Sequence, residues 1–468
     1  MASLSSKHTA SRPFPPSWRL SVLIGVYEML WHLLLPVFLL FLWRRGQREP
    51  LYRAHWDERF GASPIVLTGL DRPVWVHSAS MGEMRGAAPL VRALLAAGYP
   101  VFITTLTPAG RTAAHTLFDE AIAQRRLQVS YVPLELGWAV RRLIHRVRPR
   151  AALMTEIDTW PVLLATIRRQ GVPLAMANAQ YPKKSIVRDR KWGGFRAGIF
   201  QAYELVLCKS KTHAQRFRDV GCERVVIAGE TRFDLPVSPQ QLAAAHALLA
   251  PWQLATASPG LRPVVCFASA IVGEDEQFID AIRLVQAGLQ AAGLPSPLVV
   301  YVPRSPQRFD TVVQLMEGAD LRVARRSRML DAALQPTPDA PDMSGIDVLV
   351  GDSLGEMYFY LALSQVVVVG ASFVPLGAHN VIEPLALKKP VMVGPSIWGI
   401  EYPGVEALAA GVLQQHMTIA SLSKALVQLL TSPTEYARAI DGAEAFYAEH
   451  GGATTKHMAT LVPWLEAR

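Results

Sequence analysis

The segment VVVVGASFVPLGAHNVIEPLALKKPVMVGP (366–395) decides the fold class of this chain. Two continuous apolar runs, QVVVVG (365–370) and PVMVG (390–394), enclose a loop of small residues and a short helical pattern. Uninterrupted apolar runs that are separated by helices are typical of parallel strands covered on both faces. The segment therefore predicts a strand–helix–strand unit within a parallel sheet of an α/β protein.

The same alternation extends along the 468-residue chain. The earlier apolar runs are VWVH (74–77), PVFITT (100–105), LQVSYV (127–132), AALMTE (151–156), PLAMAN (173–178), ELVLCKS (204–210) and RVVIAG (224–229). A Pro- and Ala-rich stretch at 231–261 interrupts the pattern. The pattern then resumes with PVVCFAS (263–269), PLVVYVP (297–303) and DVLVG (347–351). Two doubly wound domains are predicted, with a hinge in the interrupting stretch and substrates in the cleft between the domains.

A nearly continuous apolar segment at 20–43 predicts a membrane-anchor helix. Glu28 and His32 are its only strongly polar side chains, and the tryptophans at positions 18, 31 and 43 are placed like interfacial anchors. The segment is short enough that the helix either crosses the bilayer or lies in the interface. Basic residues after the helix slightly outnumber those before it, which places the body of the chain in the cytoplasm. The expected division is 1–48 for the tail and anchor, 49–230 for the N-terminal domain and 231–468 for the C-terminal domain.

The composition predicts a basic globular protein in a reducing compartment. The formal net charge of +9 favours an anionic partner. No RNA-binding or helix-turn-helix signature accompanies the basic residues, so a membrane surface or a phosphorylated substrate is favoured over nucleic acid. Cys208, Cys222 and Cys266 have neither the even number of a disulfide framework nor the spacing of a zinc site. Such cysteines indicate a cytosolic face for the body of the protein.

Two acidic segments follow predicted strands in the first half of the chain. In HSASMGEMRGAAPL (77–90), Glu83 opens a helix, where a carboxylate either caps the helix or takes part in chemistry. In MTEIDTWP (154–161), Glu156 and Asp158 emerge from a buried strand. Two carboxylates at this spacing indicate binding or catalysis, and a salt-bridged or capping pair is the alternative.

The second half contains two candidate anion-binding segments. YVPRSPQRFD (301–310) delivers Arg304 at a strand end, which suits recognition of a phosphate or carboxylate, with structural pairing to an Asp as the alternative. The small-residue loop of the opening segment leads into a helix N-terminus, a favourable place for a nucleotide phosphate. That loop contains Ser372, Gly377, His379 and Asn380. Glu383, one turn into the helix, is placed to accept hydrogen bonds from ribose hydroxyls.

From residue 52 onward the sequence resembles the 3-deoxy-manno-octulosonic acid (Kdo) transferases. The matching elements, in the family's order, are ERFG (58–61), WVHSASMGE (75–83), TTLTPAG (104–110), YVPLE (131–135), EIDTWP (156–161), ANAQYPKKS (177–185), AGETRFD (228–234), VPRSPQRF (302–309), GDSLGEM (351–357) and GASFVPLGAHNVIEP (370–384). The resemblance implies the GT-B fold, in which two Rossmann-like domains enclose a cleft. It also implies a CMP-Kdo donor held mainly by the C-terminal domain. The implied acceptor is a phosphorylated lipid, the lipid A precursor lipid IVA, at the N-terminal domain near the membrane.

The resemblance further implies a role for each matching residue. Glu83 matches the catalytic base, and Glu156 and Asp158 match two acids of a Glu-x-Glu-x-Trp-Pro motif. The implied donor-binding residues are Arg304, Gly355, Glu356, Ser372, Gly377, His379, Asn380 and Glu383. Direct displacement of CMP by the acceptor hydroxyl would invert the anomeric carbon. We expect no metal ion, since no Asp-x-Asp signature is present, and no cofactor besides the donor substrate.

Several positions depart from the family pattern. They are Asp158 in place of Glu, Ala371 and Ala378 in place of Gly, and Gln180, Ile271 and Trp398 within altered motifs. Two alternatives stay open: a paralogue that transfers an acidic sugar from a CMP-sugar to a different acceptor, and an inactive membrane-bound homologue. A sugar-nucleotide epimerase on the same scaffold needs no lipid acceptor, and the apolar anchor argues against it. The expected location is the cytoplasmic face of a bacterial inner membrane, in lipopolysaccharide biosynthesis.

Overall fold

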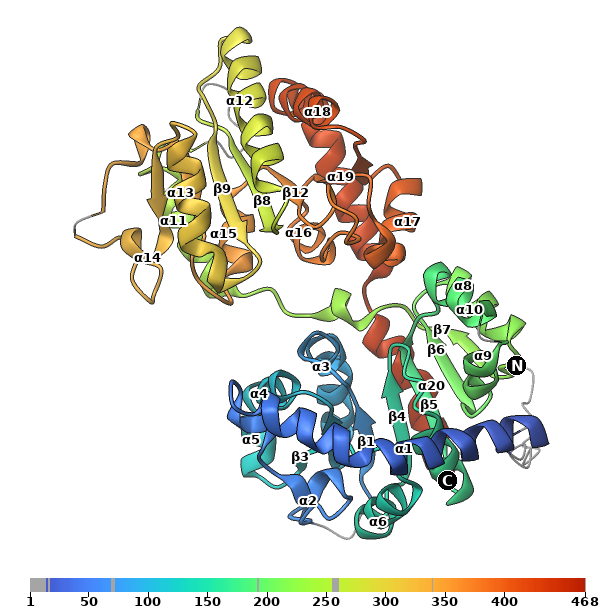
Figure 1. Ribbon diagram of the computed structural model, residues 1–468. Helices are drawn as coiled ribbons and strands as arrows, with labels where there is room; N and C mark the ends of the chain where they lie inside the picture. The colour runs from blue at the N-terminus through green and yellow to red at the C-terminus, as the bar shows by residue number, and fades with distance from the viewer. Residues whose placement is uncertain are drawn as a thin grey trace. The chain divides into compact units, whose positions relative to one another are not determined.

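The computed structural model describes residues 14–15, 17–68, 72–191, 193–254, 261–338 and 340–467. The chain forms two compact units, and Figure 1 shows the elements of each. Unit 1 combines Met1–Leu235 with Gly451–Arg468, and unit 2 is Pro236–His450. Each unit contains one seven-stranded sheet, and all paired strands are parallel. The predicted α/β class with two Rossmann-like sheets is confirmed.

The sheet of unit 1 reverses its strand order next to its first strand. Its order is β3-β2-β1-β4-β5-β6-β7. The strands are β1 Val74–His77, β2 Val101–Thr105, β3 Leu127–Tyr131, β4 Ala151–Thr155, β5 Leu174–Ala179, β6 Leu205–Cys208 and β7 Val225–Ile227. β1 pairs with both β2 and β4, so the chain leaves β1 and β4 at neighbouring points of the carboxyl edge. Parallel sheets bind ligands at such a switch point.

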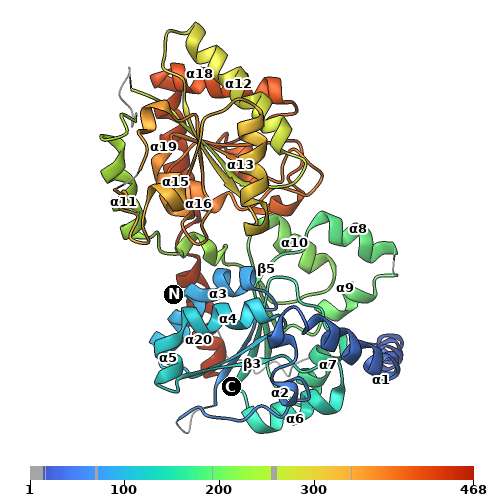
Figure 2. The same cartoon turned by 60° about the vertical axis from the view of Figure 1, so that its left-hand side comes forward.

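Alternate side chains of these strands are buried on opposite faces of the sheet. Trp75 and Phe102 pack on the face covered by α6, α7, α9 and α10, whereas Val74 and Val76 pack on the face covered by α3, α4 and α20. Figure 2 shows unit 1 from a second side. The helices of unit 1 are α1 Trp18–Arg45, η1 Pro50–Tyr52, α2 Trp56–Arg59, α3 Met81–Ala96, α4 Pro108–Leu117, α5 Asp119–Ala123, α6 Gly137–Val147, α7 Pro161–Arg169, α8 Lys183–Lys191, α9 Phe195–Phe200, α10 Lys211–Asp219, η2 Thr231–Asp234 and α20 Ala453–Glu466.

The sheet of unit 2 repeats the arrangement, with the order β10-β11-β9-β8-β12-β13-β14. Its strands are β8 Val264–Ala270, β9 Leu298–Pro303, β10 Val323–Arg325, β11 Val348–Val350, β12 Val366–Val369, β13 Val391–Val393 and β14 Leu413–Gln415. Its helices are α11 Pro239–Leu249, α12 Asp275–Ala291, η3 Pro306–Arg308, α13 Phe309–Gly318, α14 Arg326–Met329, η4 Met343–Gly345, α15 Met357–Leu363, α16 Ile382–Ala386, η5 Trp398–Ile400, α17 Glu401–Ala409, α18 Ile419–Thr431 and α19 Pro433–His450. Here the switch point lies between β8 and β12.

Three features add to the predicted organisation. The chain's last helix, α20, which the sequence placed with the second domain, packs against α3 in unit 1. The predicted hinge at 231–261 contains η2 and α11, and its residues 255–260 lie outside the described residues. The domain boundaries after residues 48 and 230 stay predictions. Helix α1 is long and apolar enough to cross a membrane by length and composition.

Candidate active site

Glu83 lies in the first turn of α3, directly after β1. The Ser80 hydroxyl caps this helix by accepting from the Glu83 N–H at 3.3 Å. The Glu83 carboxylate in turn accepts from the Ala79 N–H through Oε2, at 2.7 Å. Burial and the nearby Glu156 carboxylate raise the pKa of Glu83 above its ordinary value. Glu83 therefore is a helix cap and also a carboxyl group whose pKa is shifted toward neutral pH, as a general base requires.

Glu156 follows β4 and is held by several charged or polar partners. Its backbone φ of +63° lies in the left-handed region, which is uncommon for a non-glycine residue and concentrates at functional sites. Oε1 accepts from Arg232 Nη2 at 2.7 Å and lies 3.5 Å from Lys209 Nζ. Oε2 accepts from Gln180 Nε2 at 2.6 Å. Gln180, one of the departures from the family pattern, thus contacts the candidate site directly.

Two cations keep Glu156 ionised. Burial alone raises its pKa, but the charges of Lys209 and Arg232 outweigh burial and hold the pKa below the ordinary value. Lys209 also pairs with the buried Glu230, with Nζ 2.5 Å from Oε2. Arg232 donates to the Gly82 carbonyl at 3.2 Å and so links Glu156 to the helix of Glu83. An ion-paired carboxylate is a poor proton acceptor, so Glu156 suits positioning and electrostatics better than general-base chemistry.

Asp158 pairs with a histidine that sequence analysis did not single out. Its Oδ2 lies 3.5 Å from His77 Nε2, and neither atom has a hydrogen-bond partner within the described residues. The other ring nitrogen of His77 lies 2.9 Å from the Thr104 hydroxyl. Burial lowers the pKa of His77 to about 4. Burial, and then the charges of Glu83 and Glu156, raise the pKa of Asp158 well above its ordinary value. A neutral imidazole therefore faces a carboxyl group that favours its protonated form.

In unit 2, Arg304 follows β9 and is exposed. Burial and, to a smaller extent, the Arg304 charge lower the pKa of His379 to about 4, so the two side chains are electrostatic neighbours. The His379 N–H donates to the Gly370 carbonyl at 3.0 Å. Its Nε2 is buried and has no hydrogen-bond partner in the described part of the chain. A cation and a neutral imidazole together suit a phosphate oxygen.

The small-residue loop after β12 already holds an anion, and that anion is a carboxylate of the same unit. The N–H groups of Ala371, Ser372 and Phe373 donate to Glu274 at 2.7, 3.0 and 3.0 Å. The Ser372 hydroxyl donates to the Val369 carbonyl at 2.6 Å. The loop N–H groups and the Ser372 hydroxyl are therefore already hydrogen-bonded within unit 2. Glu274 was missed because nothing in its local sequence distinguishes it from a first-turn helix acid.

The remaining predicted donor residues lie at loops of the same unit. Gly377 has a φ of +96°, and a Cβ there would lie 2.6 Å from the Gly399 nitrogen, so only glycine fits beside Trp398. Asn380 Oδ1 accepts from the N–H of Ile382, the first residue of α16, at 3.0 Å. Burial, and then the charge of Glu383, raise the pKa of Tyr358. Helix α16 has only 5 residues, and a helix this short supplies a weaker dipole to a phosphate than the sequence predicted.

Gly355 and Glu356 follow β11. Gly355 has a φ of +83° and its carbonyl accepts from Gln241 Nε2 at 2.8 Å. Glu356 forms an ion pair with Arg326 and accepts from the Ser353 hydroxyl. The structure therefore brings Glu83, Glu156 and Asp158 together in unit 1, and Arg304 and His379 together in unit 2. In the described residues, no group of three or more His, Cys, Asp or Glu side chains is arranged to hold a metal ion.

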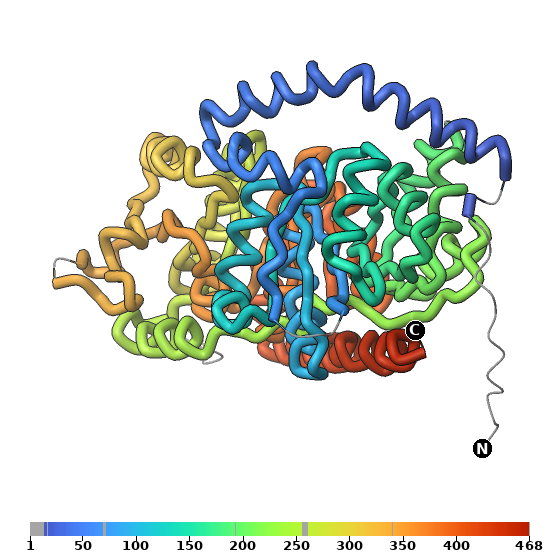
Figure 3. Tube along the Cα trace, turned by 90° about the horizontal axis from the view of Figure 1, so that it is seen from below, coloured from blue at the N-terminus to red at the C-terminus, as the bar shows by residue number. Residues whose placement is uncertain are grey.

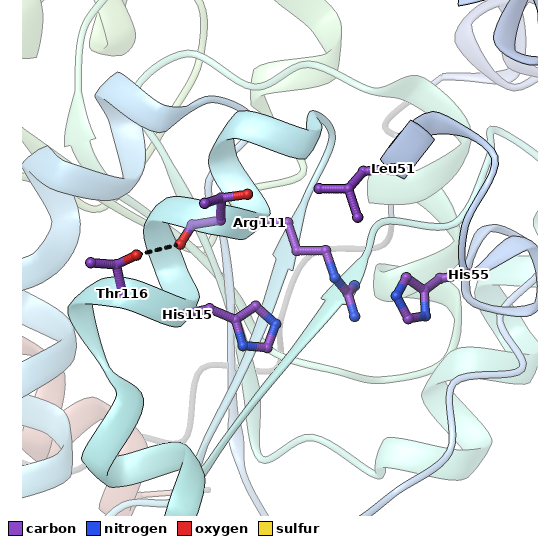
Figure 4. Close-up of a pocket in the computed structure, with 6 residues that line it drawn as sticks. Leu51, His55, Arg111, His115 and Thr116 are labelled. Atoms are coloured by element: carbon purple, nitrogen blue, oxygen red, sulfur yellow. Dashed lines mark hydrogen bonds between the residues drawn. The ribbon is translucent and has the colours of Figure 1, made fainter. Parts of the chain in front are cut away.

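A separate cavity of about 560 Å³ lies beside α4 in unit 1 (Figure 4). It is lined by Leu51, His55, Arg111, Thr112, His115 and Thr116. The Arg111 side chain lines this cavity, and its guanidinium group donates two hydrogen bonds to the buried Glu58 carboxylate, at 2.5 and 3.1 Å. No predicted catalytic or donor residue lines the cavity, so it is distinct from the candidate site.

Comparison with known proteins gives consistent relatives. The 3-deoxy-D-manno-octulosonic-acid transferase (kdotransferase) family matches residues 54–235. The 3-deoxy-D-manno-octulosonic acid transferase of Bordetella pertussis is 37% identical over 447 residues, which are 94% of this chain and 99% of that protein. The protein of the same name from Haemophilus influenzae is 28% identical over 92% of this chain and 96% of its own length.

Solved structures show the same architecture at low sequence identity. The UDP-GlcNAc 2-epimerase from Neisseria meningitidis has a TM-score of 0.55 and 14% identity, covering 84% of this chain and 100% of that chain. A glycosyltransferase from Rickettsia africae has a TM-score of 0.52 and 11% identity, covering 84% and 98%. These similarities concern the fold alone, which is of the GT-B type.

Proposed function

We propose, because the chain belongs to the 3-deoxy-D-manno-octulosonic acid (Kdo) transferase family, that it transfers Kdo from CMP-Kdo to the lipid A precursor lipid IVA with inversion of the anomeric carbon. The arrangement of Glu83 beside the ion-paired Glu156 at the switch point of the first sheet carries this proposal. One carboxyl group there is kept ionised, and its neighbour has a raised pKa. This is the division of roles that general-base catalysis requires.

In the proposed reaction, Glu83 is the base. The acceptor hydroxyl transfers its proton to the Glu83 carboxylate while its oxygen bonds to the anomeric carbon of Kdo. The bond between that carbon and the phosphate oxygen breaks, and CMP leaves with the electron pair. Attack and departure on opposite sides of the carbon invert its configuration. Glu156 is the positioning residue, since Arg232 joins it to the Gly82 carbonyl one residue before Glu83.

Asp158 and His77 have a supporting role in this proposal. Their facing Oδ2 and Nε2 atoms lie 3.5 Å apart in a buried setting. A protonated Asp158 adds no second negative charge beside Glu83. The pair therefore limits the repulsion that would otherwise raise the pKa of the base beyond a useful value.

The donor is proposed to bind unit 2 through Arg304 and His379. Arg304 is an exposed cation directly after β9, and the neutral His379 presents a buried Nε2 beside it. Together they would stabilise the phosphate of departing CMP. Gly377, Asn380 and Glu383 are proposed to shape the nucleotide pocket, and Gly355 and Glu356 its opposite wall. Ser372 would act indirectly, by holding the loop in place.

The acceptor and the location are proposals of the same kind. The apolar helix α1 supports attachment to the inner membrane, where a phosphorylated lipid acceptor is present. The test is to incubate the purified full-length protein with CMP-Kdo and lipid IVA and to read the product by mass spectrometry, with the anomeric configuration from NMR. The expected product is an inverted Kdo–lipid adduct. A CMP-Kdo turnover that requires another acceptor would instead support the paralogue, and no turnover with any CMP-sugar would support the inactive homologue.

A further inference from the structure

Helix α1 is apolar on every side, yet within the described residues only one of its sides is covered by protein. The covered side contains Leu20, Ile24, Glu28 and Leu42, and the partly buried Tyr27, Trp31, Leu35, Phe38 and Leu39 follow the same stripe. These positions recur every three or four residues, as they do along one face of a helix. The opposite stripe consists of exposed large apolar residues: Val22, Leu23, Val26, Met29, Leu30, Leu33, Leu34, Val37, Leu40 and Phe41.

The covered stripe contacts the rest of unit 1 near the start and in the middle of the helix. Near its start, Leu20 and Ile24 are 6% and 1% exposed and pack in the core that contains α7 and α9. A Cβ at Gly198 of α9 would lie 3.3 Å from Leu20, so the approach is close. In the middle, Trp31 and the residues that follow it on the stripe pack on the cluster around Leu136. Figure 3 shows α1 as a long, bowed helix that runs beside unit 1 rather than away from it.

Glu28 provides a polar contact at the centre of the helix. Its Oε1 accepts from the N–H of Gly137, the first residue of α6, at 2.8 Å. A Cβ at Gly137 would lie 2.6 Å from that oxygen, so the carboxylate occupies the space that a side chain would take. The one acidic residue of the apolar segment therefore makes a hydrogen bond to another part of unit 1. At the far end, Arg53 Nε donates to the Trp43 carbonyl at 2.8 Å.

The length of this contact decides the topology. Leu20 and Leu42 are separated by about 33 Å along a helix axis, because each residue advances about 1.5 Å. The hydrocarbon core of a bilayer is about 30 Å thick. A helix that crossed the bilayer would need a stretch of this length surrounded by lipid and free of unit 1. No such stretch is left between the first and the last contact.

We propose that α1 is a monotopic anchor: it lies in the plane of the membrane with its covered stripe on unit 1 and its exposed stripe in the hydrocarbon of one leaflet. This inference rests on the membrane attachment proposed above and adds its geometry. The ten large apolar side chains of the exposed stripe are each 44–67% exposed, and an exposed apolar patch of many neighbouring side chains is typical of a membrane or partner interface. Trp18 and Trp43, 72% and 49% exposed, mark its two ends, as expected for interfacial anchors.

The charges beside α1 favour lipid over a second copy of the chain. Helix α8 carries exposed Arg188, Arg190 and Lys191 and packs on α9, which contacts the start of α1. Arg44 and Arg45 are exposed at the other end of α1. Two copies joined through this face would bring like charges together. An anionic lipid surface would attract them, at about 1 kcal/mol for each Lys or Arg near it.

The first test is the side of the membrane on which each end of α1 lies. Arg19→Cys and Gln47→Cys replace exposed residues at the two ends. The natural Cys208, Cys222 and Cys266 are buried, so wild-type protein is the unlabelled control. In sealed inside-out membrane vesicles, an impermeant maleimide should label both variants. Labelling of Gln47→Cys alone, with Arg19→Cys labelled only after detergent, would show that α1 spans the bilayer and would overturn the proposal while leaving attachment intact.

The second test detects the docked helix directly. The pair Glu28→Cys with Gly137→Cys should form a disulfide in oxidised membranes, and the matched pair Leu33→Cys with Gly137→Cys, on the exposed stripe, should not. Equal yields from both pairs would contradict docking. Disulfide-linked dimers through Leu33→Cys alone would identify a second copy as the occupant and also overturn the proposal. Release of wild-type protein from vesicles in high salt would refute membrane attachment itself, which separates that failure from a wrong topology.

Discussion

Replacing Glu274 tests whether the donor loop of unit 2 depends on an internal anion. The side chain is fully buried, and its carboxylate accepts from the N–H groups of Ala371, Ser372 and Phe373 at 2.7–3.0 Å. It also accepts from Ile271 at 3.2 Å. Burial raises the pKa of Glu274, while these four N–H groups act in the opposite direction.

Glu274→Ala would leave the loop donors without a partner. Each unsatisfied buried donor costs about 1–3 kcal/mol. Because the loop can relax and admit water, we expect a total loss of about 3–5 kcal/mol in the free energy of unfolding, in the lower half of the roughly 3–9 kcal/mol that three such donors sum to. Glu274→Gln keeps one carbonyl oxygen as an acceptor and should lose about half as much. The displaced loop should also weaken CMP binding.

The measurements are urea unfolding of the full-length protein in detergent and calorimetric titration with CMP. Glu276→Ala is the matched control, since Glu276 lies in the same first turn of α12 and is exposed. That control should stay within about 0.5 kcal/mol of wild type. If Glu274→Ala unfolds within about 1 kcal/mol of wild type and binds CMP normally, the carboxylate does not organise the loop.

Further predictions concern catalysis and stability. Glu83→Gln should lower kcat by about 10²- to 10⁴-fold while CMP affinity changes little, and near-normal turnover would eliminate Glu83 as the base. Transfer should persist in excess EDTA, and recovery of lost activity only on adding Mg²⁺ or Mn²⁺ would contradict the metal-free mechanism. The acid limb of the kcat/KM profile should lie above the ordinary carboxyl range because the pKa of Glu83 is raised. Glu156→Gln should move this limb to lower pH, because it removes a negative charge beside Glu83 and frees a cation, and both changes lower the pKa of Glu83. An unchanged limb would show that Glu83 and Glu156 are not coupled. Ala371→Gly and Ala378→Gly relieve positive φ angles of +61° and should raise the unfolding free energy by up to about 1 kcal/mol each, so a loss in both would refute strain at these sites.

Most of the fold follows from the apolar runs, and the exceptions have a common cause. Every predicted run became a strand, but β10 and β14 were not predicted. Both are edge strands of three residues with partly exposed side chains. A strand that is covered on few sides needs no continuous apolar run, so its sequence lacks the signal that identifies central strands.

The place of α20 depends on contacts that sequence order does not reveal. His457 Nε2 accepts from the Asn178 N–H at 3.2 Å, and Asp234 accepts from the Gly452 N–H at 2.7 Å. Both pairs join residues more than two hundred positions apart. The chain therefore returns to unit 1 after completing unit 2. The alternation of apolar runs and helices in the sequence cannot show this return, because it assigns each helix to the same domain as the strands just before it.

The candidate site shows the same limit. Glu83, Glu156 and Asp158 were predicted because each follows a buried strand, and strand ends at a switch point meet. Lys209 and Arg232, which determine the charge state of Glu156, lie later in the chain, after β6 and β7. Arg232 is part of the matching element AGETRFD (228–234), but nothing in the sequence pairs either cation with Glu156. Such charge partners are brought together only by the tertiary fold. The sequence therefore predicted the carboxyl groups but not the cations that give them different pKa values.

Those partners explain how several carboxyl groups can share one buried site. Lys209 and Arg232 balance the charges of Glu156 and Glu230. Glu83 has no ion pair with a Lys or Arg in the described part of the chain, and burial together with the charge of Glu156 raises its pKa. A base with a raised pKa accepts a proton more readily from a weakly acidic hydroxyl, provided that it is ionised at the working pH. Since Asp in place of Glu at position 158 shortens a side chain but keeps its carboxyl group, that departure alters distances within the site rather than this division of roles.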